Sequence, residues 1–278
     1  IEVFSEIARE KNVERSELGS ILEGLFLHLV ERERGDSSNC SVIVNLDKGE
    51  FEIYVEKTIV DDIEDPVMEI TLEEISQVAK KYNLIILSDE IYSELSFKED
   101  FKSISNFCPE KTIISTGLSK WCGAGGWRLG YFIIPDTLKN LRDSINVLAS
   151  ETFSSVSAPI QYAAITAYST DYSKYINDSK NILKAVGNYV YENLKSNKVI
   201  INKSQGGFYL MPEFSNKSFS TSSEMCDNLL KETGVALLPG SDFGFDEKRM
   251  LARLSFTDFN GQDFMKNIQG KKEINNDL

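Results

Sequence analysis

Three short, nearly continuous apolar runs constrain the fold of this chain more than any other feature. They are NLIILSDEIY (83–92), TIIST (112–116) and GYFII (130–134). Runs of this length and composition are typical of strands buried in a parallel sheet. Segments with a helical pattern lie between and after them, and alternating strands and helices indicate an α/β fold with a mostly parallel sheet.

The segments around these runs complete the α/β pattern. TLEEISQVAKKY begins with Thr71 and Glu74, a capping-box pair, and continues as an amphipathic helix. Most of 135–149 and 155–196 is helical by pattern. Shorter strands then follow in KVIIN, GGFYLM and MLARLSF, with a helix near 221–233. This last part predicts a small α+β domain at the C-terminal end.

The first 72 residues have a different character. A helix pair is followed by the hairpin pattern CSVIVNLDKGEFEIYVEKTIV, and the second helix, in SELGSILEGLFLHLVERERG, stops at Gly35. Residues 1–72 hold 7 lysines and arginines against 18 aspartates and glutamates, whereas the rest of the chain is close to neutral. Such asymmetry indicates two units with different surfaces.

Composition excludes several function classes. The 278 residues carry a net charge of −13, which argues against direct binding to nucleic acid. A single histidine and four cysteines without paired spacing argue against a metal centre and a Ser-His-Asp triad. No apolar run reaches the ~18 residues of a membrane span, and the first residues have no secretory pattern. We therefore expect a cytoplasmic protein without a membrane partner.

The stretch TIISTGLSKWCGAGGWRLGY places reactive and anion-binding groups beside a glycine-rich turn. Lys120 can form an imine with a carbonyl, and Arg128 can clamp a phosphate through two parallel hydrogen bonds. The hydroxyls of Thr116 and Ser119 are available to the same phosphate. Taken alone, a lysine and an arginine at this spacing are common, and two surface cations beside a loop are the better interpretation of Lys120 and Arg128.

A carboxylate and a phenol lie upstream in SDEIYSELSF. Asp89 ends a predicted strand, where ligands bind in open α/β sheets, and could keep a pyridine nitrogen protonated. Tyr92 could offer its hydroxyl to a ring oxygen. Each residue also has a structural alternative, because Asp89 could cap a helix and Tyr92 could belong to the core.

Together, SDEIY, STGLSK, GWRLGY and ARLSF resemble the class I/II aminotransferases, which are fold-type I enzymes of pyridoxal 5′-phosphate. The resemblance runs from about residue 71 to about 268. It implies that Lys120 is the Schiff-base lysine and proton shuttle, that Asp89 pairs with the pyridinium nitrogen, and that Tyr92 contacts the ring hydroxyl. Ser119 and Arg128 match phosphate-contacting positions.

The same resemblance implies a substrate site. Arg253 matches the arginine that grips the substrate α-carboxylate, and GGFYLM (206–211) and VALLPGSDFG (235–244) look like the strand and loop beside it. The implied reaction moves an amino group between an α-amino acid and a 2-oxo acid, in a homodimer. The part of these enzymes that precedes the resemblance, with its phosphate-binding turn, is expected to be missing here.

Residues 1–72 instead resemble the start of the N-terminal domain of the transcription elongation factor NusA. The matching stretches are LVERERG, VIVNLDKGEFEIYVEKTIV and EDPVMEITLEE, and the resemblance implies a contact with RNA polymerase. We expect a chimera, with a NusA-like unit at 1–72, a partial large domain at 73–165 and a small domain at 166–278. A non-enzymatic polymerase-binding adaptor and an inactive fusion remain alternatives to the aminotransferase.

Overall fold

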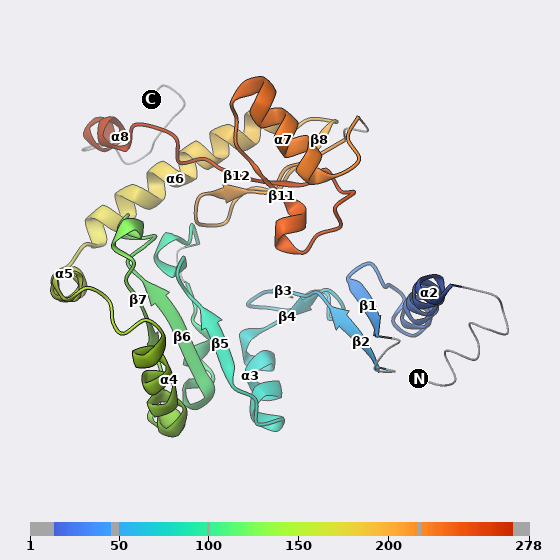
Figure 1. Cartoon of the computed structure of the whole chain (residues 1–278), viewed down its shortest axis with the longest axis horizontal. Helices are drawn as coiled ribbons and strands as arrows, with labels where there is room; N and C mark the ends of the chain where they lie inside the picture. Colours follow the sequence, from blue (N-terminus) through green and yellow to red (C-terminus); the bar gives the residue numbers. More distant parts are fainter. Residues whose placement is uncertain (1–13, 46–49, 99–100, 216–217, 269–278) are drawn as a thin grey trace. The chain divides into compact units, whose positions relative to one another are not determined.

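The computed structural model describes residues 14–45, 50–98, 101–215 and 218–268 (Figure 1). The chain divides into two compact units. The first comprises Ile1–Ile86 and Ile104–Lys111, and the second comprises Leu87–Ser103 and Thr112–Leu278. Within the described residues no helix is long and apolar enough to cross a membrane.

The first unit begins with a helix and a hairpin, as the sequence predicts. Helix α2 (Arg15–Arg34) ends at Gly35, whose φ of 85° puts it in the left-handed region that glycine adopts without strain. Strands β1 (Cys40–Asn45) and β2 (Glu50–Val55) pair antiparallel. The predicted turn residues 47–49 and the first predicted helix lie outside the described residues, so both stay predictions.

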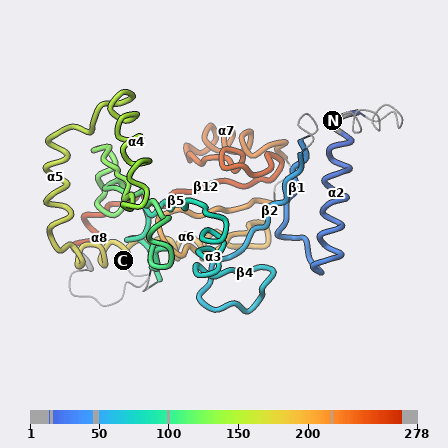
Figure 2. Tube along the Cα trace, turned by 90° about the horizontal axis from the view of Figure 1, so that it is seen from below, coloured from blue at the N-terminus to red at the C-terminus, as the bar shows by residue number. Residues whose placement is uncertain are grey.

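Helix α2 lies alongside this hairpin in both views (Figures 1 and 2). Phe26 of the helix stacks on Phe51 of β2, with ring centroids 4.5 Å apart. The Glu23 carboxylate accepts a hydrogen bond of 3.3 Å from the backbone N–H of Val44. Aromatic and polar contacts of this kind fix the helix on one side of the hairpin.

The N-cap that the sequence predicts from Thr71 is confirmed at the start of helix α3 (Leu72–Lys81). The Thr71 hydroxyl accepts from the backbone N–H of Glu74 at 3.1 Å. The Lys80 ammonium, in the last turn, donates to the carbonyl oxygen of Phe107 at 2.7 Å. This unit also contains two short parallel strands and two 3₁₀ turns: β3 (Thr58–Ile59), β4 (Glu69–Ile70), η2 (Ile104–Asn106) and η3 (Pro109–Lys111).

The predicted α/β fold is confirmed in the second unit, but one strand pair differs from the predicted parallel sheet. The sheet has the order β5–β6–β7, from β5 (Ile86–Asp89), β6 (Thr112–Gly117) and β7 (Gly130–Ile133). Strands β6 and β7 pair antiparallel, with Thr116 opposite Tyr131. The loop between them turns the chain back, so the prediction of another parallel strand at β7 was wrong.

The burial predicted for these strands is also wrong in part. Ile113 of β6 is buried, but Leu87 of β5 is 66% exposed, and Phe132 and Ile133 of β7 are 53% and 51% exposed. An apolar strand is buried only if another layer covers its face. Within the described residues, these positions of β5 and β7 lack such a layer.

The helices predicted between residues 135 and 196 are confirmed. They follow the 3₁₀ turn η5 (Asp136–Leu138), and their bounds are α4 (Lys139–Thr152), α5 (Ala158–Ser169) and α6 (Ser173–Leu194). Helix α5 begins with Ala158-Pro159, and proline suits the first turn because the N–H that it lacks would have no helical partner there.

The C-terminal part has the short strands and the helix that the sequence predicts. The helices are α7 (Ser222–Thr233) and α8 (Gly261–Ile268), with the 3₁₀ turn η6 (Gly240–Phe243). The strands are β8 (Val199–Ile200), β9 (Tyr209–Leu210), β10 (Glu213–Phe214), β11 (Leu238–Pro239) and β12 (Ala252–Ser255). Strand β12 pairs antiparallel with both β9 and β11. The boundaries at 72 and 165 stay predictions.

Candidate active site

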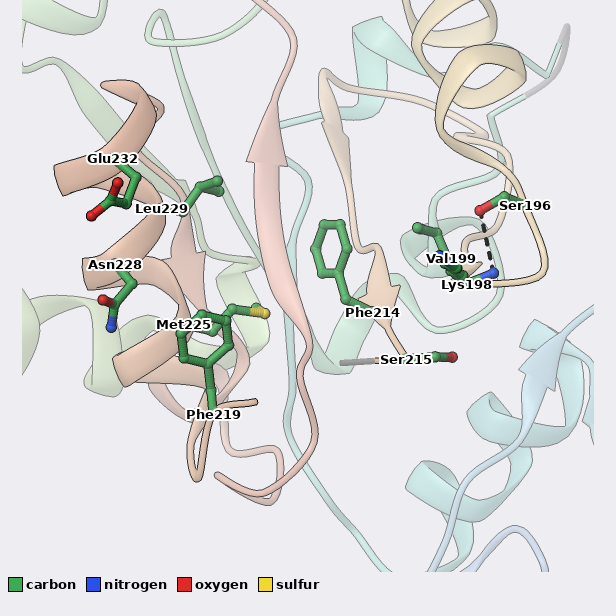
Figure 3. Close-up of a pocket in the computed structure, with 10 residues that line it drawn as sticks. All are labelled: Ser196, Lys198, Val199, Phe214, Ser215, Phe219, Met225, Asn228, Leu229 and Glu232. Atoms are coloured by element: carbon green, nitrogen blue, oxygen red, sulfur yellow. Dashed lines mark hydrogen bonds between the residues drawn. The ribbon is translucent and has the colours of Figure 1, made fainter. Parts of the chain in front are cut away.

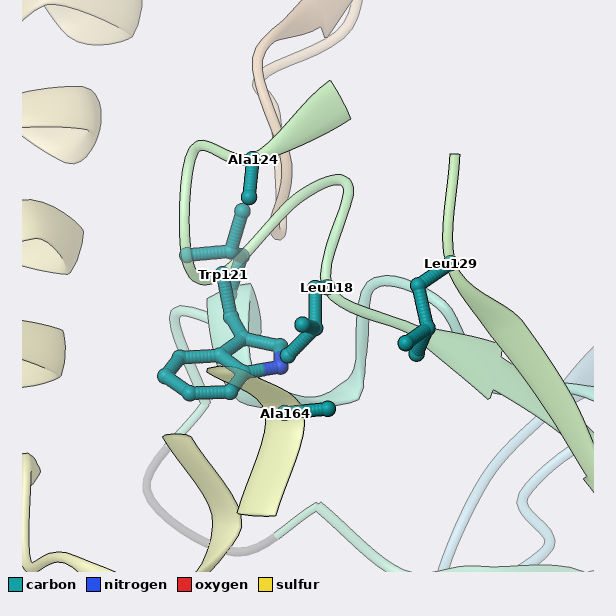
Figure 4. Close-up of a cluster of buried hydrophobic side chains, with 6 residues drawn as sticks. Leu118, Trp121, Ala124, Leu129 and Ala164 are labelled. Carbon is teal, nitrogen blue, oxygen red and sulfur yellow. The ribbon is translucent and has the colours of Figure 1, made fainter. Parts of the chain in front are cut away.

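The loop that carries Lys120 is held by its own packing. A Cβ at Gly117 would lie 2.5 Å from the carbonyl oxygen of Leu129, so only glycine lets β6 and β7 approach this closely. The N–H of Leu118 donates to that same oxygen at 3.2 Å. The buried side chains Leu118, Trp121, Ala124 and Leu129 pack with Ala164 of α5 (Figure 4). The backbone on either side of Lys120 is therefore well anchored.

The Lys120 side chain lies among aromatic rings. Its Nζ is 5.3 Å from the ring centroid of Tyr92 and 5.4 Å from that of Phe208, distances at which an ammonium is attracted to a ring face. Ser119 and Lys120 both line a cavity of about 470 Å³, together with residues of α6 and α8. The amine thus faces a cavity that has room for a small molecule.

Asp89 and Tyr92 line a neighbouring cavity of about 320 Å³. Asp89 is the last residue of β5, and its exposed carboxylate accepts from the backbone N–H of Ile91 at 3.2 Å. Tyr92 precedes η1 (Ser93–Leu95), and its ring forms an edge contact with Phe208 at 5.7 Å. Tyr92 lines the cavity of Asp89 and Phe208 lines the cavity of Lys120, so this ring contact links the linings of the two cavities.

Tyr209 connects the lysine region to Arg253. Burial and a hydrogen bond to the Tyr92 hydroxyl raise the pKa of Tyr209, while the charges of Lys120 and Arg253 act in the opposite direction. The Arg253 guanidinium carbon is 4.4 Å from the Tyr209 ring centroid. The structure therefore brings Tyr92, Lys120, Tyr209 and Arg253 into one cluster.

Two predicted phosphate contacts lie outside this cluster. Arg128 has a left-handed backbone, with φ of 53°, and its Nη1 donates to the carbonyl oxygen of Gly125 at 2.9 Å. Thr116 lies on β6, where it pairs with Tyr131. Neither residue lines the cavities beside Lys120 and Asp89. Ser119 does, next to the lysine.

The residues present fit a phosphorylated aldehyde with a ring nitrogen. An amine, a carboxylate and a phenol surround adjoining cavities, and the backbone beside Tyr92 is open enough for close approach. Gly207 has φ of 64°, and a Cβ there would lie 3.2 Å from the Tyr92 ring. A side chain at Gly207 would therefore crowd the phenol that is predicted to contact the ring hydroxyl.

A larger cavity, of about 740 Å³, lies between α7 and the β8–β10 pair (Figure 3). Phe214, Phe219, Met225 and Leu229 give it an apolar lining. None of the predicted site residues lines it, and no motif in the sequence predicts it.

Three aromatic residues of the site were not identified from the sequence. Phe208 and Tyr209 lie in the GGFYLM stretch, and Phe243 lies in VALLPGSDFG, both of which were placed beside the substrate carboxylate. The Phe243 ring centroid is 4.5 Å from the guanidinium carbon of Arg253. The only signal was that these stretches adjoin Arg253, which identifies a region but no residue.

Comparison with known proteins places two profiles on this chain. The profile for aminotransferase class I and II matches residues 69–261, and the profile for the NusA N-terminal domain matches residues 1–114. The two matches overlap over α3 and the start of the β5–β7 sheet.

The relatives of the matched region are aminotransferases. An aspartate aminotransferase of Sulfolobus acidocaldarius is 33% identical over 197 residues, which is 66% of this chain and 46% of that protein. A probable N-acetyl-LL-diaminopimelate aminotransferase of Bacillus subtilis is 35% identical over 173 residues, 62% of this chain and 42% of that protein. The solved structure of an alanine aminotransferase from Pyrococcus furiosus superposes with a TM-score of 0.60 at 28% identity, covering 72% of this chain and 52% of that one.

The chain thus spans about half the length of the curated relatives that it matches. The solved structures confirm a fold-type I arrangement for the matched part. Enzymes of class I and II use pyridoxal phosphate, the cofactor that the donor set around Lys120 fits. Since the family profile covers well over half of its residues, the chain belongs to the class I and II aminotransferases.

Proposed function

We propose that this chain binds pyridoxal phosphate through Lys120 and transfers an amino group between an α-amino acid and a 2-oxo acid. The observation that carries the proposal is the cluster of Tyr92, Lys120, Tyr209 and Arg253, in which an amine, a phenol and a guanidinium converge. Residues on four separate segments reach this cluster, which argues against a chance pairing of surface cations.

Each residue has a role in holding the cofactor. Lys120 would bond to its aldehyde carbon, Asp89 would keep its ring nitrogen protonated, and Tyr92 would donate to its ring oxygen. Ser119 is the hydroxyl beside Lys120 that is available to the phosphate. Arg128 and Thr116 would join it after their side chains turn toward the cavity, since Arg128 now donates to Gly125. When bound, the cofactor supplies an electron sink that stabilises a carbanion at the substrate α-carbon.

Two residues would act on the substrate. Arg253 would bind the α-carboxylate, a planar anion that a guanidinium holds through two parallel hydrogen bonds. The Lys120 amine, once free, would take the proton from the α-carbon as a general base and return a proton afterwards. The Tyr92 and Phe208 rings keep this amine on the side of the site where the substrate would lie.

An absorbance titration of the full chain with pyridoxal phosphate tests this function. We expect the visible absorbance change that follows attachment of the aldehyde to an amine, at a one-to-one ratio, and we expect Lys120→Ala to remove it. Lys174→Ala is the matched control, because Lys174 is an exposed lysine paired with Asp178 at 2.6 Å. If Lys120→Ala titrates like the unmodified chain, the proposed site is wrong.

A second candidate function rests on the NusA N-terminal match at residues 1–114. We propose that the first unit contacts RNA polymerase through α2, whose Ile21 and Leu25 are 53% and 51% exposed. Capture of purified polymerase by the full chain is the test. The double variant Ile21→Asp/Leu25→Asp should lose capture, whereas Val147→Asp, at a 67% exposed position of α4, should keep it. Equal capture by all three chains contradicts the adaptor function.

The proposal also covers the junction between the NusA-like part and the aminotransferase part of the chain. We infer a chimera, with a NusA-like unit at 1–72, a partial large domain at 73–165 and a small domain at 166–278, in the cytoplasm and as a homodimer when active. If neither the titration nor the capture succeeds, the chain is an inactive fusion. A sequencing read across codons 60–80 of the genomic locus would test the junction, and two separate genes there would contradict it.

A further inference from the structure

We propose that Tyr209 and Phe243 form an aromatic clamp that holds Arg253 edge-on and restricts it to planar carboxylates. The inference rests on the proposed function, in which Arg253 binds the substrate carboxylate. Tyr209 and Phe243 are positioning residues here, because they act through Arg253. The clamp would also determine which acidic group the site accepts.

Two rings lie unusually close to one guanidinium. The Arg253 guanidinium carbon is 4.4 Å from the Tyr209 centroid and 4.5 Å from the Phe243 centroid. Among the described ring pairs there is no contact between Tyr209 and Phe243, whereas Tyr209 does contact Tyr92 and Phe208. Two rings that both touch the same small group without touching each other approach it from different sides.

The strand register explains the position of Tyr209. Strand β12 pairs with β9 so that Ser255 lies opposite Tyr209. Arg253 is two residues from Ser255, so its side chain is on the same face of the sheet as that of Tyr209, in a diagonal pair. Long side chains in diagonal pairs of this kind reach each other.

A close turn explains the position of Phe243. Strand β11 pairs with β12 so that Leu238 lies opposite Arg253, and η6 follows directly. The N–H of Gly240 donates to the carbonyl oxygen of Leu251 at 2.7 Å, and a Cβ at Gly240 would lie 2.9 Å from the Leu251 Cβ. Glycine at this position therefore lets η6 fold back over β12, which brings Phe243 to Arg253.

Among the residues that the structure describes, no carboxylate forms an ion pair with Arg253. Within the described residues, its contacts are the two rings and no ion pair. Arg249 offers a direct contrast, since it also lies over a ring, that of Phe245 at 5.4 Å, but donates to both carboxylate oxygens of Glu213 at 3.0 and 2.7 Å. Arg249 is a structural arginine, and Arg253 keeps its donors for a ligand.

Stacking on both sides limits the directions in which Arg253 can donate. Guanidinium N–H groups lie in the plane of the group, and two rings that approach from different sides would exclude ligand atoms from its faces. A carboxylate presents two oxygens in one plane and fits this edge. A phosphonate has a third oxygen outside that plane, which would meet one of the rings. The clamp should therefore favour the carboxylate.

The test measures protection of Arg253 in the full chain without added cofactor. Phenylglyoxal modifies accessible arginines, and peptide mapping gives the extent of modification at Arg253. The probes are propionate and ethylphosphonate, which have the same apolar chain and neither of which reacts with lysine. We expect propionate to protect Arg253 at a concentration about tenfold lower than ethylphosphonate. A tenfold ratio in affinity corresponds to the strength of one contact between a cation and an aromatic ring.

The variants separate the clamp from general packing. Phe243→Leu and Tyr209→Leu should each raise the half-protecting propionate concentration about tenfold and bring the ratio between the probes close to one. Phe243→Tyr, which keeps a ring, should restore both values. Phe245→Leu removes the ring beside Arg249 and should change neither. A variant that fails to fold would lose protection by both probes, whereas loss of the clamp leaves protection by both at a ratio near one. The two cases are therefore distinguishable.

Two results would overturn the inference. One is equal protection by propionate and ethylphosphonate, or no protection by either, in the unmodified chain. The other is an unchanged ratio in both leucine variants. The proposed function fails separately, since selective protection of Arg253 without attachment of pyridoxal phosphate leaves the clamp standing and rejects the cofactor site.

Discussion

The loop from Leu118 to Leu129 and the strands β5 and β7 differ in how far their apolar side chains are buried. The loop buries Leu118 completely and leaves Trp121 8% exposed, whereas Leu87 of β5 and Phe132 of β7 are 66% and 53% exposed. Both regions are apolar in sequence. The difference shows that the loop is buried in a core shared with Leu95 and Ala164, while β5 and β7 have apolar faces that the described residues do not cover.

Truncating a buried side chain of the loop should have the largest effect on the free energy of unfolding. Leu118→Ala is expected to lower the free energy of unfolding by about 3 kcal/mol, because it leaves a cavity among Trp121, Leu129 and Ala164. Phe132→Ala should cost less than about 1 kcal/mol, since half of that ring is already in water. Urea unfolding followed by tryptophan fluorescence measures both. If both variants lost the same free energy of unfolding, the loop would be no better buried than β7, which would contradict the comparison.

Adding a methyl group at Gly117, where the loop leaves β6, should have the next largest effect on stability. Gly117→Ala would place a Cβ against the Leu129 carbonyl oxygen and force β6 away from β7, at a cost of about 1–3 kcal/mol. Gly126→Ala is the control, because nothing lies within 4 Å of a Cβ there. Thermal unfolding of the two variants is the measurement. A Gly117→Ala protein as stable as Gly126→Ala would contradict the close approach of the strands.

The ion pair between Arg249 and Glu213 should have a small effect on the free energy of unfolding, and this effect should depend on pH. Hydrogen bonds from Arg249 lower the pKa of Glu213 below its ordinary value of 4.5. A carboxyl with a lowered folded-state pKa stabilises the fold above its unfolded value, and this contribution is lost as the pH falls through the folded value. The pair is partly exposed, so its contribution is at most about 1 kcal/mol.

The measurement for this pair is the stability difference between the protein and Arg249→Leu. We expect a constant difference above pH 5, which shrinks as the solution is made more acidic than the ordinary glutamate value of 4.5. Leu118→Ala should show the same acid dependence as the unmodified protein, since its core contains no carboxylate. A difference for Arg249→Leu that grows in acid would have the wrong sign.

Local signals in the sequence predicted local structure well. The αL glycine Gly35 ended α2, and Thr71 capped α3 through its hydroxyl, because both depend only on neighbouring backbone. The loop around Lys120 was recognisable for the same reason. Its glycines and its lysine lie within one short stretch, so the side of the site that they form could be read directly.

Features that depend on distant residues could not be predicted. The apolar pattern of β7 is the same whether the strand runs parallel or antiparallel, and it does not reveal whether a second layer covers Phe132. The aromatic partners of Arg253 come from β9 and η6, which lie 44 and 10 residues away in the chain. Spatial neighbours at such separations have no signature in a single sequence.

Reductive trapping tests the cofactor site most directly. The full chain is incubated with pyridoxal phosphate at low excess, reduced with borohydride so that any bond to an amine becomes permanent, digested and mapped by mass spectrometry. We expect the label on the peptide containing Lys120, near one equivalent, and we expect it to disappear in Lys120→Ala. A label spread over exposed lysines such as Lys174, with Lys120 unmodified, would contradict the proposed cofactor site.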